Sequence, residues 1–197
     1  MNWKVLVVIS LLGYGAYQQW QSRYVTYGPG VIAPITPQQS NVSGAYHLSS
    51  FNDYQITPLA KFNVSARVLS TKTYNFGREA QLSPIDFALG WGRMSDEAIL
   101  SQIKISQSGR FYFWHVNNFP IPREEIETQS ANMHMVPVNS AIEKNLKDVR
   151  VGQVVNLQGY LIEAKAADGW HWKSSLSRED TGNGSCELMM VEHISVR

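Results

Sequence analysis

The chain has 197 residues, of which 44% are hydrophobic and 17% charged, a composition typical of one folded domain with a tether and not of a disordered protein. Its 17 basic and 16 acidic side chains leave a formal net charge of +1, so no strong positive field is present to hold a nucleic-acid backbone. A single cysteine, Cys186, excludes an intramolecular disulfide and a multi-cysteine metal site.

The chain opens with a hydrophobic segment whose strongly apolar part runs from Val5 to about Tyr17. That length is shorter than the roughly 20 residues that span a bilayer and falls within the roughly 7–15 of a signal-peptide centre. No small-residue cleavage pattern follows, and Trp3 and Trp20 are placed as interfacial anchors. We therefore expect residues 1–22 to be a membrane anchor or signal segment.

This expectation places residues 3–20 in the inner membrane as a single pass, with the C-terminal domain in the periplasm. Secretion after signal cleavage is the alternative that the apolar length leaves open.

Residues 23–50 are rich in Gly, Pro, Ser, Gln and Asn, with Pro29, Pro34 and Pro37 spaced through them. Such a composition is typical of an extended linker. A globular, β-rich domain is predicted to follow over residues 51–197.

Alternating apolar and polar residues predict the first strand of the domain over Lys61–Thr71. Two short amphipathic helices are predicted next. One is capped by Ser95, with the acids Asp96 and Glu97 in its first turn, and the other is opened by a capping box at Ser140–Glu143. Between them, Phe111–Trp114 has the aromatic composition of a strand.

The C-terminal third predicts a long strand over residues 152–162 with a bend at Gly159, then a hairpin turn at Asp168-Gly169 and a final strand over about 187–196. Together these elements predict an α+β fold that is mainly β. It is a small curled sheet or an oligonucleotide/oligosaccharide-binding-type (OB-like) barrel with two short helices, preceded by an N-terminal hydrophobic helix.

One candidate ligand-binding cluster lies in residues 130–137, where Asn132 and His134 stand among hydroxyl and thioether side chains. Met133 and Met135 either fill the core from a strand, while His134 points to water or bonds to a carbonyl, or they act with His134 as soft Cu(I) ligands. Three ligands adjacent in sequence cannot all point inward from one strand, so no metal is assigned.

The second candidate cluster is the polar loop of residues 174–187, from which we select Ser174, Ser175, Ser177, Arg178 and Asp180 as ligand-binding residues. The planar guanidinium of Arg178 suits a carboxylate or phosphate. Alternatively, Arg178 pairs with an acid of its own loop and orders the turn. We expect the two clusters to lie side by side with Arg178 facing the first one.

Four stretches, together with the hydrophobic start, resemble a family of small proteobacterial membrane-anchored proteins of uncharacterised activity: SPIDFALGWGRMSDEAIL, ISQSGRFYFW, SANMHMVP and SSLSREDTGNGSCEL. The resemblance covers most of residues 54–197. It implies a membrane location and a single domain, and it assigns no catalytic residue.

Two short stretches also resemble the Ser-Met-x-Pro and Ser-x-Asp-Ser-Arg boxes of type I signal peptidases, which are membrane-anchored serine peptidases with a lysine base. They are residues 134–137 and 174–178. His134 stands at the position of the nucleophile, so the resemblance implies a displaced dyad of Ser130 with Lys165 or Lys173.

These observations predict a membrane-tethered, non-catalytic binding or assembly module of the bacterial cell envelope, with an envelope protein or a small polar ligand as partner. No cofactor and no nucleic acid are expected. The alternative is an envelope serine hydrolase or signal-peptidase-like peptidase, which needs a serine hydroxyl within about 3 Å of an imidazole or amine.

Overall fold

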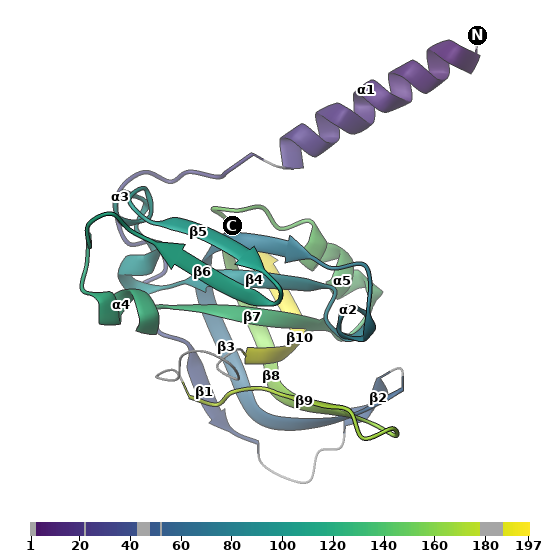
Figure 1. Cartoon of the computed structure of the whole chain (residues 1–197), viewed down its shortest axis with the longest axis vertical. Coiled ribbons are helices and arrows are strands. Elements are labelled where there is room, and N and C mark those ends of the chain that lie inside the picture. Colours follow the sequence, from purple (N-terminus) through teal and green to yellow (C-terminus); the bar gives the residue numbers. More distant parts are fainter. Residues whose placement is uncertain (1–2, 22, 43–47, 52, 178–186) are drawn as a thin grey trace.

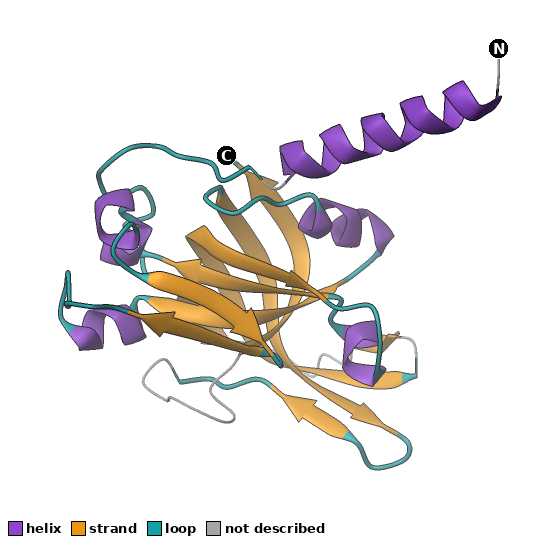
Figure 2. Ribbon diagram, turned by 45° about the horizontal axis from the view of Figure 1, so that its top comes forward, coloured by secondary structure: helices purple, strands orange, loops and turns teal. Residues whose placement is uncertain are grey.

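The computed structural model describes residues 3–21, 23–42, 48–51, 53–177 and 187–197. It shows an α+β chain dominated by one mixed sheet (Figures 1 and 2), which confirms the predicted class. The strands are β1 (Gln38–Asn41), β2 (Leu48–Phe51), β3 (Tyr54–Thr73), β4 (Ile85–Gly90), β5 (Lys104–Ser108), β6 (Phe111–His115), β7 (Ser130–Pro137), β8 (Val154–Ala166), β9 (His171–Lys173) and β10 (Glu187–Val196).

The helices of the described chain are α1 (Trp3–Gln21), α2 (Arg78–Leu82), α3 (Glu97–Leu100), α4 (Arg123–Thr128) and α5 (Ser140–Lys147), with a 3-10 turn η1 (Gly92–Ser95). The two predicted domain helices are α3 and α5. The acidic residues Glu124, Glu125 and Glu127 after Pro122 predict a further short helix, which is α4. The structure adds α2, a single short turn that lacks a hydrophobic period long enough to identify, so a total of two short helices was too low.

Strand β3 confirms the strand predicted over residues 61–71 and is longer at both ends. Buried and less buried residues alternate from Tyr54 to Ala66. Phe62, Val64, Ala66 and Val68 are all buried on the inner face. They pack against Phe87, Met133, Leu161 and Met189 from β4, β7, β8 and β10. Apolar burial from five strands therefore forms the main core.

The main sheet runs in the order β1-β3-β4-β7-β10-β8-β9, with β2 paired to β3. β7 and β10 are parallel, whereas the other pairings are antiparallel. β3 also pairs with β8, from Tyr54↔Ala166 to Arg67↔Val154. Long, bulged strands thus curl the sheet around its own core.

A separate hairpin, β5–β6, lies across the outer face of β4 and β7 (Figure 1). Tyr112 and Trp114 of β6 point from the hairpin toward the sheet. They pack against a second apolar cluster that includes Ala88 and Ile126. Phe111 and Phe113 alternate with them and face solvent. The hairpin therefore encloses outward-facing residues of β7 that would otherwise contact water.

Helix α1 projects away from the domain (Figures 1 and 2). Consecutive apolar residues from Val5 to Ile9 are all exposed, at 44–56%, so the helix is apolar on every side. Within the described residues, no helix combines the length and the apolar character that crossing a membrane requires.

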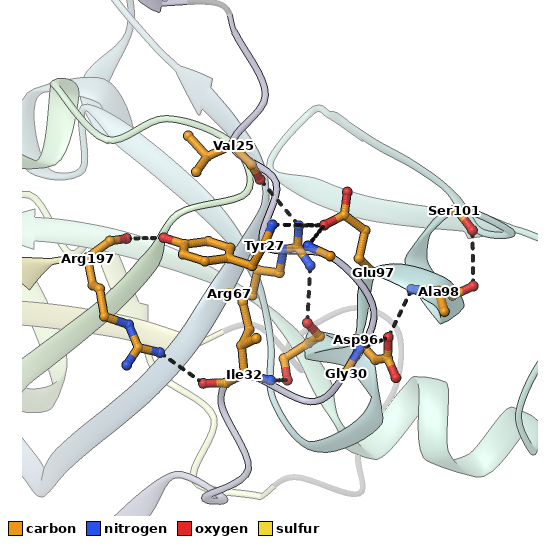
Figure 3. A network of polar contacts seen from close by, with 12 residues as sticks. Val25, Tyr27, Gly30, Ile32, Arg67, Asp96, Glu97, Ala98, Ser101 and Arg197 are labelled. Carbon is orange, nitrogen blue, oxygen red and sulfur yellow. Dashed lines mark hydrogen bonds and ion pairs between the residues drawn. The ribbon is translucent and has the colours of Figure 1, made fainter.

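Residues 25–33, within the stretch predicted as a linker, are tied to the domain (Figure 3). The side chain of Arg67 is completely buried and donates to the carbonyl of Val25 at 3.3 Å and to Glu97 at 3.2 Å. Glu97 in turn accepts the backbone N–H groups of Tyr27 and Gly28, each at 3.0 Å. An extended, Pro- and Gly-containing segment thereby becomes part of the folded body.

The same segment is held at a second point by the start of α3. The hydroxyl of Ser95 accepts the N–H groups of Ile32 at 3.2 Å and Ala33 at 3.0 Å. Asp96, the N-cap of α3, accepts the N–H groups of Gly30 and Ala98, both at 2.9 Å. The N–H groups of Gly30, Ile32 and Ala33 do not belong to a strand. The side chains of Ser95 and Asp96 give them acceptors in place of a strand partner.

The contact between Glu97 and this segment is expected to depend on pH. Partial burial acts to raise the pKa of Glu97, but the Tyr27 N–H, the Arg67 guanidinium and the Gly28 N–H outweigh it and lower the pKa below its ordinary value of 4.5. A lowered folded-state pKa means that this stabilisation is complete above the ordinary pKa and is lost as pH falls through the lowered one.

In NMR spectra the amide signals of Tyr27 and Gly28 should therefore move together, with a midpoint below pH 4.5. Glu97→Gln should abolish the movement. A midpoint above the ordinary pKa would contradict the proposed ion pair.

Candidate functional site

Strand β7 separates the first predicted cluster onto two faces. Met133 and Met135 are fully buried in the main core, as the structural alternative for these residues predicted. Asn132 and His134 lie on the opposite face, Asn132 beneath the β5–β6 hairpin and His134 beside Asp86 and Trp172. His134 is buried, so the expectation that it points to water was wrong. The two sulfur atoms thus point away from the imidazole, and the three side chains cannot surround one metal ion.

His134 is 2% exposed and lies in a charged, aromatic environment. It is the direct cross-strand neighbour of Asp86 on β4, and its Nδ1 atom is 3.0 Å from Asp86 Oδ1. Its ring centroid is 4.7 Å from that of Trp172 on β9. The imidazole is therefore fixed between a carboxylate and an indole.

Asp86 is the centre of this arrangement and has no exposed surface. Its Oδ1 atom accepts a hydrogen bond from Arg110 Nη1 at 2.7 Å. Arg110 stands in the β5–β6 turn with a positive φ of 71°, and its other terminal nitrogen donates to the Ser83 carbonyl at 2.9 Å. Its Nε is 3.5 Å from Glu79. One guanidinium thus joins β4, α2 and the hairpin turn.

Asn132 secures the hairpin from below. Its Nδ2 donates to the Arg110 carbonyl at 3.0 Å, and its Oδ1 accepts from Gln107 Nε2 at 2.7 Å. Both groups of the amide are therefore used to position the hairpin, which holds Arg110 over Asp86.

Aromatic rings cover the guanidinium of Arg110. Its Cζ atom lies 3.7 Å from the ring centroid of Tyr74 and 5.5 Å from that of Trp172, both within cation–π range. Burial raises the pKa of Tyr74, and the negative charge of Asp86 adds to this rise. The phenol therefore stays protonated at neutral pH.

Next to this charged group is a hollow of about 440 Å³. Its walls come from the β3–β4 connection, from the hairpin turn and from the residue preceding β9. The lining residues are Tyr74, Phe76, Gly77, Arg78, Glu79, Gly109, Arg110 and Trp170.

The second arginine of the hollow, Arg78, is also paired. It binds Asp168 at 2.7 Å, and its Cζ atom lies 4.9 Å from the Trp170 ring. The hydrogen bond from Arg78, followed by the Trp170 N–H, lowers the pKa of Asp168. Both cations of the hollow therefore have carboxylate partners.

The structure brings Ser174 close to His134 through strand β10. The Ser174 hydroxyl accepts the Leu188 N–H at 3.0 Å, and Leu188 is paired with His134 across β7–β10. Ser175 and Ser177 lie in the exposed stretch after β9, where the Ser177 N–H donates to Ser175 Oγ at 3.1 Å.

Arg178 and Asp180 lie outside the described residues, so their predicted role stays a prediction. Of the residues expected to share one site, Asn132 and His134 lie on β7. Ser174 follows β9 and bonds to Leu188 of β10, the strand beside β7.

The sequence reasoning missed Asp86 and Arg110. The available signal was an acid inside the apolar strand Ile85–Gly90, which must be paired when buried.

The buried hydroxyl of Ser130 has two partners. It donates to the Ile126 carbonyl at 2.5 Å and accepts from Tyr112 Oη at 2.7 Å. The single hydrogen of the Ser130 hydroxyl is used on the Ile126 carbonyl, so the Tyr112 phenol is the donor to Ser130. Burial raises the pKa of Tyr112 to about 12. Ser130 thus connects α4, β6 and β7.

Comparisons of this chain with protein-family models, with curated proteins and with solved structures give no match.

Proposed function

We propose that this chain is a non-catalytic binding module of the bacterial cell envelope, tethered to the inner membrane through residues 3–20 with its domain in the periplasm. Its ligand, a small polar molecule or a segment of an envelope protein, occupies the hollow beside Arg110. The observation that carries the proposal is the buried group Asp86–Arg110–His134, which fixes one wall of an aromatic hollow. Preorganised walls of this kind favour binding because little order is lost on association.

We further infer that the main sheet is an OB-like barrel. The pairing order β3-β4-β7-β10-β8, the additional β3–β8 pairing and the parallel β7–β10 pair support this assignment. In such a barrel the ligand lies between the loop after the first strand and the loop before the last. Here those connections carry Phe76 and Trp170, which both line the hollow.

Support for the tether comes from α1, whose exposed apolar residues cover all sides of the helix. An exposed apolar surface of this extent needs a covering, for which lipid is the simplest source. Secretion after cleavage of this segment stays the alternative.

Support for a non-catalytic role comes from the hydroxyls that the hydrolase alternative would use. Ser130 is bonded to a carbonyl and a phenol. Ser174 donates to the Ser175 carbonyl at 2.8 Å and accepts the Leu188 N–H. Among the residues that the structure describes, these partners give neither hydroxyl the adjacent base that nucleophilic catalysis requires.

Photo-crosslinking in cells tests the proposal. Phe76→p-benzoylphenylalanine should form adducts because this side chain is 93% exposed at the hollow, whereas the same change at Phe113, which is 53% exposed on the hairpin, should not. A C-terminal alkaline phosphatase fusion should be active, and a fluorophosphonate probe should leave the full chain unlabelled.

Equal adducts at the two positions would contradict the hollow as the binding site, and an inactive phosphatase fusion would contradict the periplasmic location. Labelling that disappears in Ser130→Ala or Ser174→Ala would instead establish the hydrolase alternative.

A further inference from the structure

We propose that the domain rests on the periplasmic surface of the inner membrane and that a second hollow, next to the end of the tether, holds an acyl chain of a bilayer lipid. This inference rests on the proposed function, because it takes α1 to lie in the membrane. It concerns a surface other than the hollow beside Arg110. Its basis is the length of the free tether, the lining of the second hollow and the bonding of the polar groups there.

The tether that separates α1 from the domain is short. Helix α1 ends at Gln21, and the Val25 N–H already donates to the Val151 carbonyl of the domain at 2.9 Å. The chain between Gln21 and Val25 spans at most about 14 Å when fully extended, at roughly 3.5 Å per residue. A linker that was free up to Phe51 could span about 100 Å instead. Docking of Val25 therefore keeps the domain close to the bilayer.

Two features hold this docking in place. Gly152 lies against Val25: a Cβ atom at this position would overlap the Val25 carbonyl, and the φ of Gly152 is 93°. Glycine alone combines such a φ with a close backbone approach at low cost. In addition, the Arg67 guanidinium bonds to the Val25 carbonyl, and its Cζ atom lies 5.4 Å from the ring centroid of Tyr24. The domain cannot move far from α1 unless these contacts break.

The second hollow lies at this docking point and has a volume of about 320 Å³. That volume is within the range of roughly 300–1,000 Å³ that is usual for small-ligand sites. Its walls come from the residue preceding Val25, from β3, α3 and β5, and from the connections before β5 and β8. The apolar side chains of the walls are those of Tyr24, Leu69, Leu100, Ile103, Ile105 and Val151. A hydrocarbon chain suits such walls because both partners bury apolar surface.

The polar side chains that line the hollow, Ser101 and Glu97, are engaged within the protein. The Ser101 hydroxyl donates to the Ala98 carbonyl at 3.0 Å, and Glu97 is paired with Arg67 at 3.2 Å. A polar ligand would have to compete with these partners, whereas an acyl chain leaves them in place. The bonding of the walls thus favours a hydrocarbon ligand over a sugar, a peptide or a phosphate.

The position of the hollow points to the bilayer as the source of that chain. The headgroup layer is roughly 5–8 Å thick on each side of the hydrocarbon core, so a reach of about 14 Å brings the hollow to the lipid surface. Tyr24 and Tyr27 are 46% and 40% exposed beside it, and tyrosine is enriched at this depth. A soluble partner would have to enter the narrow space between domain and bilayer, where lipid is already present.

The test uses the full chain in phosphatidylcholine bicelles that carry a nitroxide either near the end of one acyl chain or on the headgroup. Methyl NMR signals, assigned by single substitutions, report how near each nitroxide lies. We expect the chain label to broaden the signals of Leu100 and Ile105 more than the headgroup label does. The signal of Leu176, which bonds to Gln39 of β1 at the other end of the domain (Figure 1), should stay sharp with both labels.

A variant that fills the hollow gives a second readout. Ser101→Trp places an indole at the exposed rim and should remove at least about half of the broadening at Ile105, because the ring takes the space of the chain. Ser106→Trp is the matched control, since it makes the same change at an exposed position of β5 that lines a different hollow of the hairpin. It should leave the broadening unchanged. Both positions are exposed, so both variants should keep the melting temperature of the unmodified chain.

Three outcomes would overturn the inference: no broadening of Leu100 and Ile105 by the chain label, stronger broadening by the headgroup label, or an equal effect of the two tryptophan variants. The signals of Val7 and Leu11 in α1 separate this inference from the proposed function. If the chain label leaves these two signals sharp, the membrane tether itself is wrong. If it broadens them but leaves the hollow unaffected, the tether stands and only the lipid site is wrong.

Discussion

Replacing Arg67 by methionine is expected to lower the free energy of unfolding by about 3–5 kcal/mol. Arg67 is completely buried and donates to Ser95, Val25 and Glu97 at 3.2–3.3 Å. Methionine has a similar length but no donor, so the carbonyls of Ser95 and Val25 lose this donor, and Glu97 keeps only the N–H groups of Tyr27 and Gly28. Chemical denaturation of the full chain in micelles measures the change.

A matched control is Arg123→Met, which removes an arginine that is 69% exposed and paired with Glu127 on the same helix. Its effect should be under about 1 kcal/mol. Hydrogen exchange gives a second readout, because the amides of Tyr27 and Gly28 should exchange faster in Arg67→Met. A loss below about 1 kcal/mol for Arg67→Met would show that apolar packing replaces the ion pair.

Asp86→Ala should be similarly damaging, with an expected loss of about 3–5 kcal/mol. The carboxylate is fully buried, and its removal leaves the guanidinium of Arg110 without this acceptor and takes away the carboxylate that lies 3.0 Å from His134 Nδ1. The β5–β6 hairpin should loosen, because Arg110 holds its turn to the sheet. Thermal unfolding monitored by circular dichroism measures the loss.

The matched control for this change is Asp148→Ala, which breaks an exposed ion pair with Lys144 in one helical turn and should shift the melting temperature little. The double variant Asp86→Ala/Arg110→Met should be more stable than Asp86→Ala alone, because it also removes the stranded charge. A double variant as unstable as the sum of the single changes would contradict the pairing.

Much of the sheet could be predicted because its signals are local. Lys61–Thr71 alternates over enough residues to identify β3. The start of α3 was missed by one position, because its N-cap is Asp96 and not Ser95. The start of α5 was missed by one position: Asn139 caps the helix by accepting the Ile142 N–H at 2.9 Å, and Ser140 is already helical. Local sequence patterns predict that a helix or strand exists more accurately than they predict the residue at which it begins or ends.

The N-terminal contacts could not be predicted, because they join residues far apart in sequence. In the alternation of β3, Arg67 falls on the face opposite Phe62 and Val64, where solvent is the ordinary expectation. It is buried because residues 25–33 pass over it. The composition of residues 25–33 is the same whether the segment packs on the domain or forms a free linker.

The candidate site was predicted in part for the same reason. His134 and Asn132 are conspicuous in the sequence. Their partners lie elsewhere, Asp86 on β4 and Arg110 in the β5–β6 turn. Only the register of β4 against β7 and the placement of the hairpin bring them together. Contacts between separate strands leave no repeating pattern within any one segment, so they cannot be inferred from hydrophobic periodicity.

The pairing of β3 with β8 also bears on how the chain reaches its native state. Tyr54 pairs with Ala166 across the sheet, so β3 is synthesised well before the β8 residues that pair with it. Contacts between such distant residues close large loops, which slows folding. Until β8 emerges, one edge of β3 offers unsatisfied backbone groups to other chains. The polar side chains Lys61, Asn63 and Ser65 interrupt the apolar residues of β3. They reduce the tendency of β3 to aggregate before it pairs with β8.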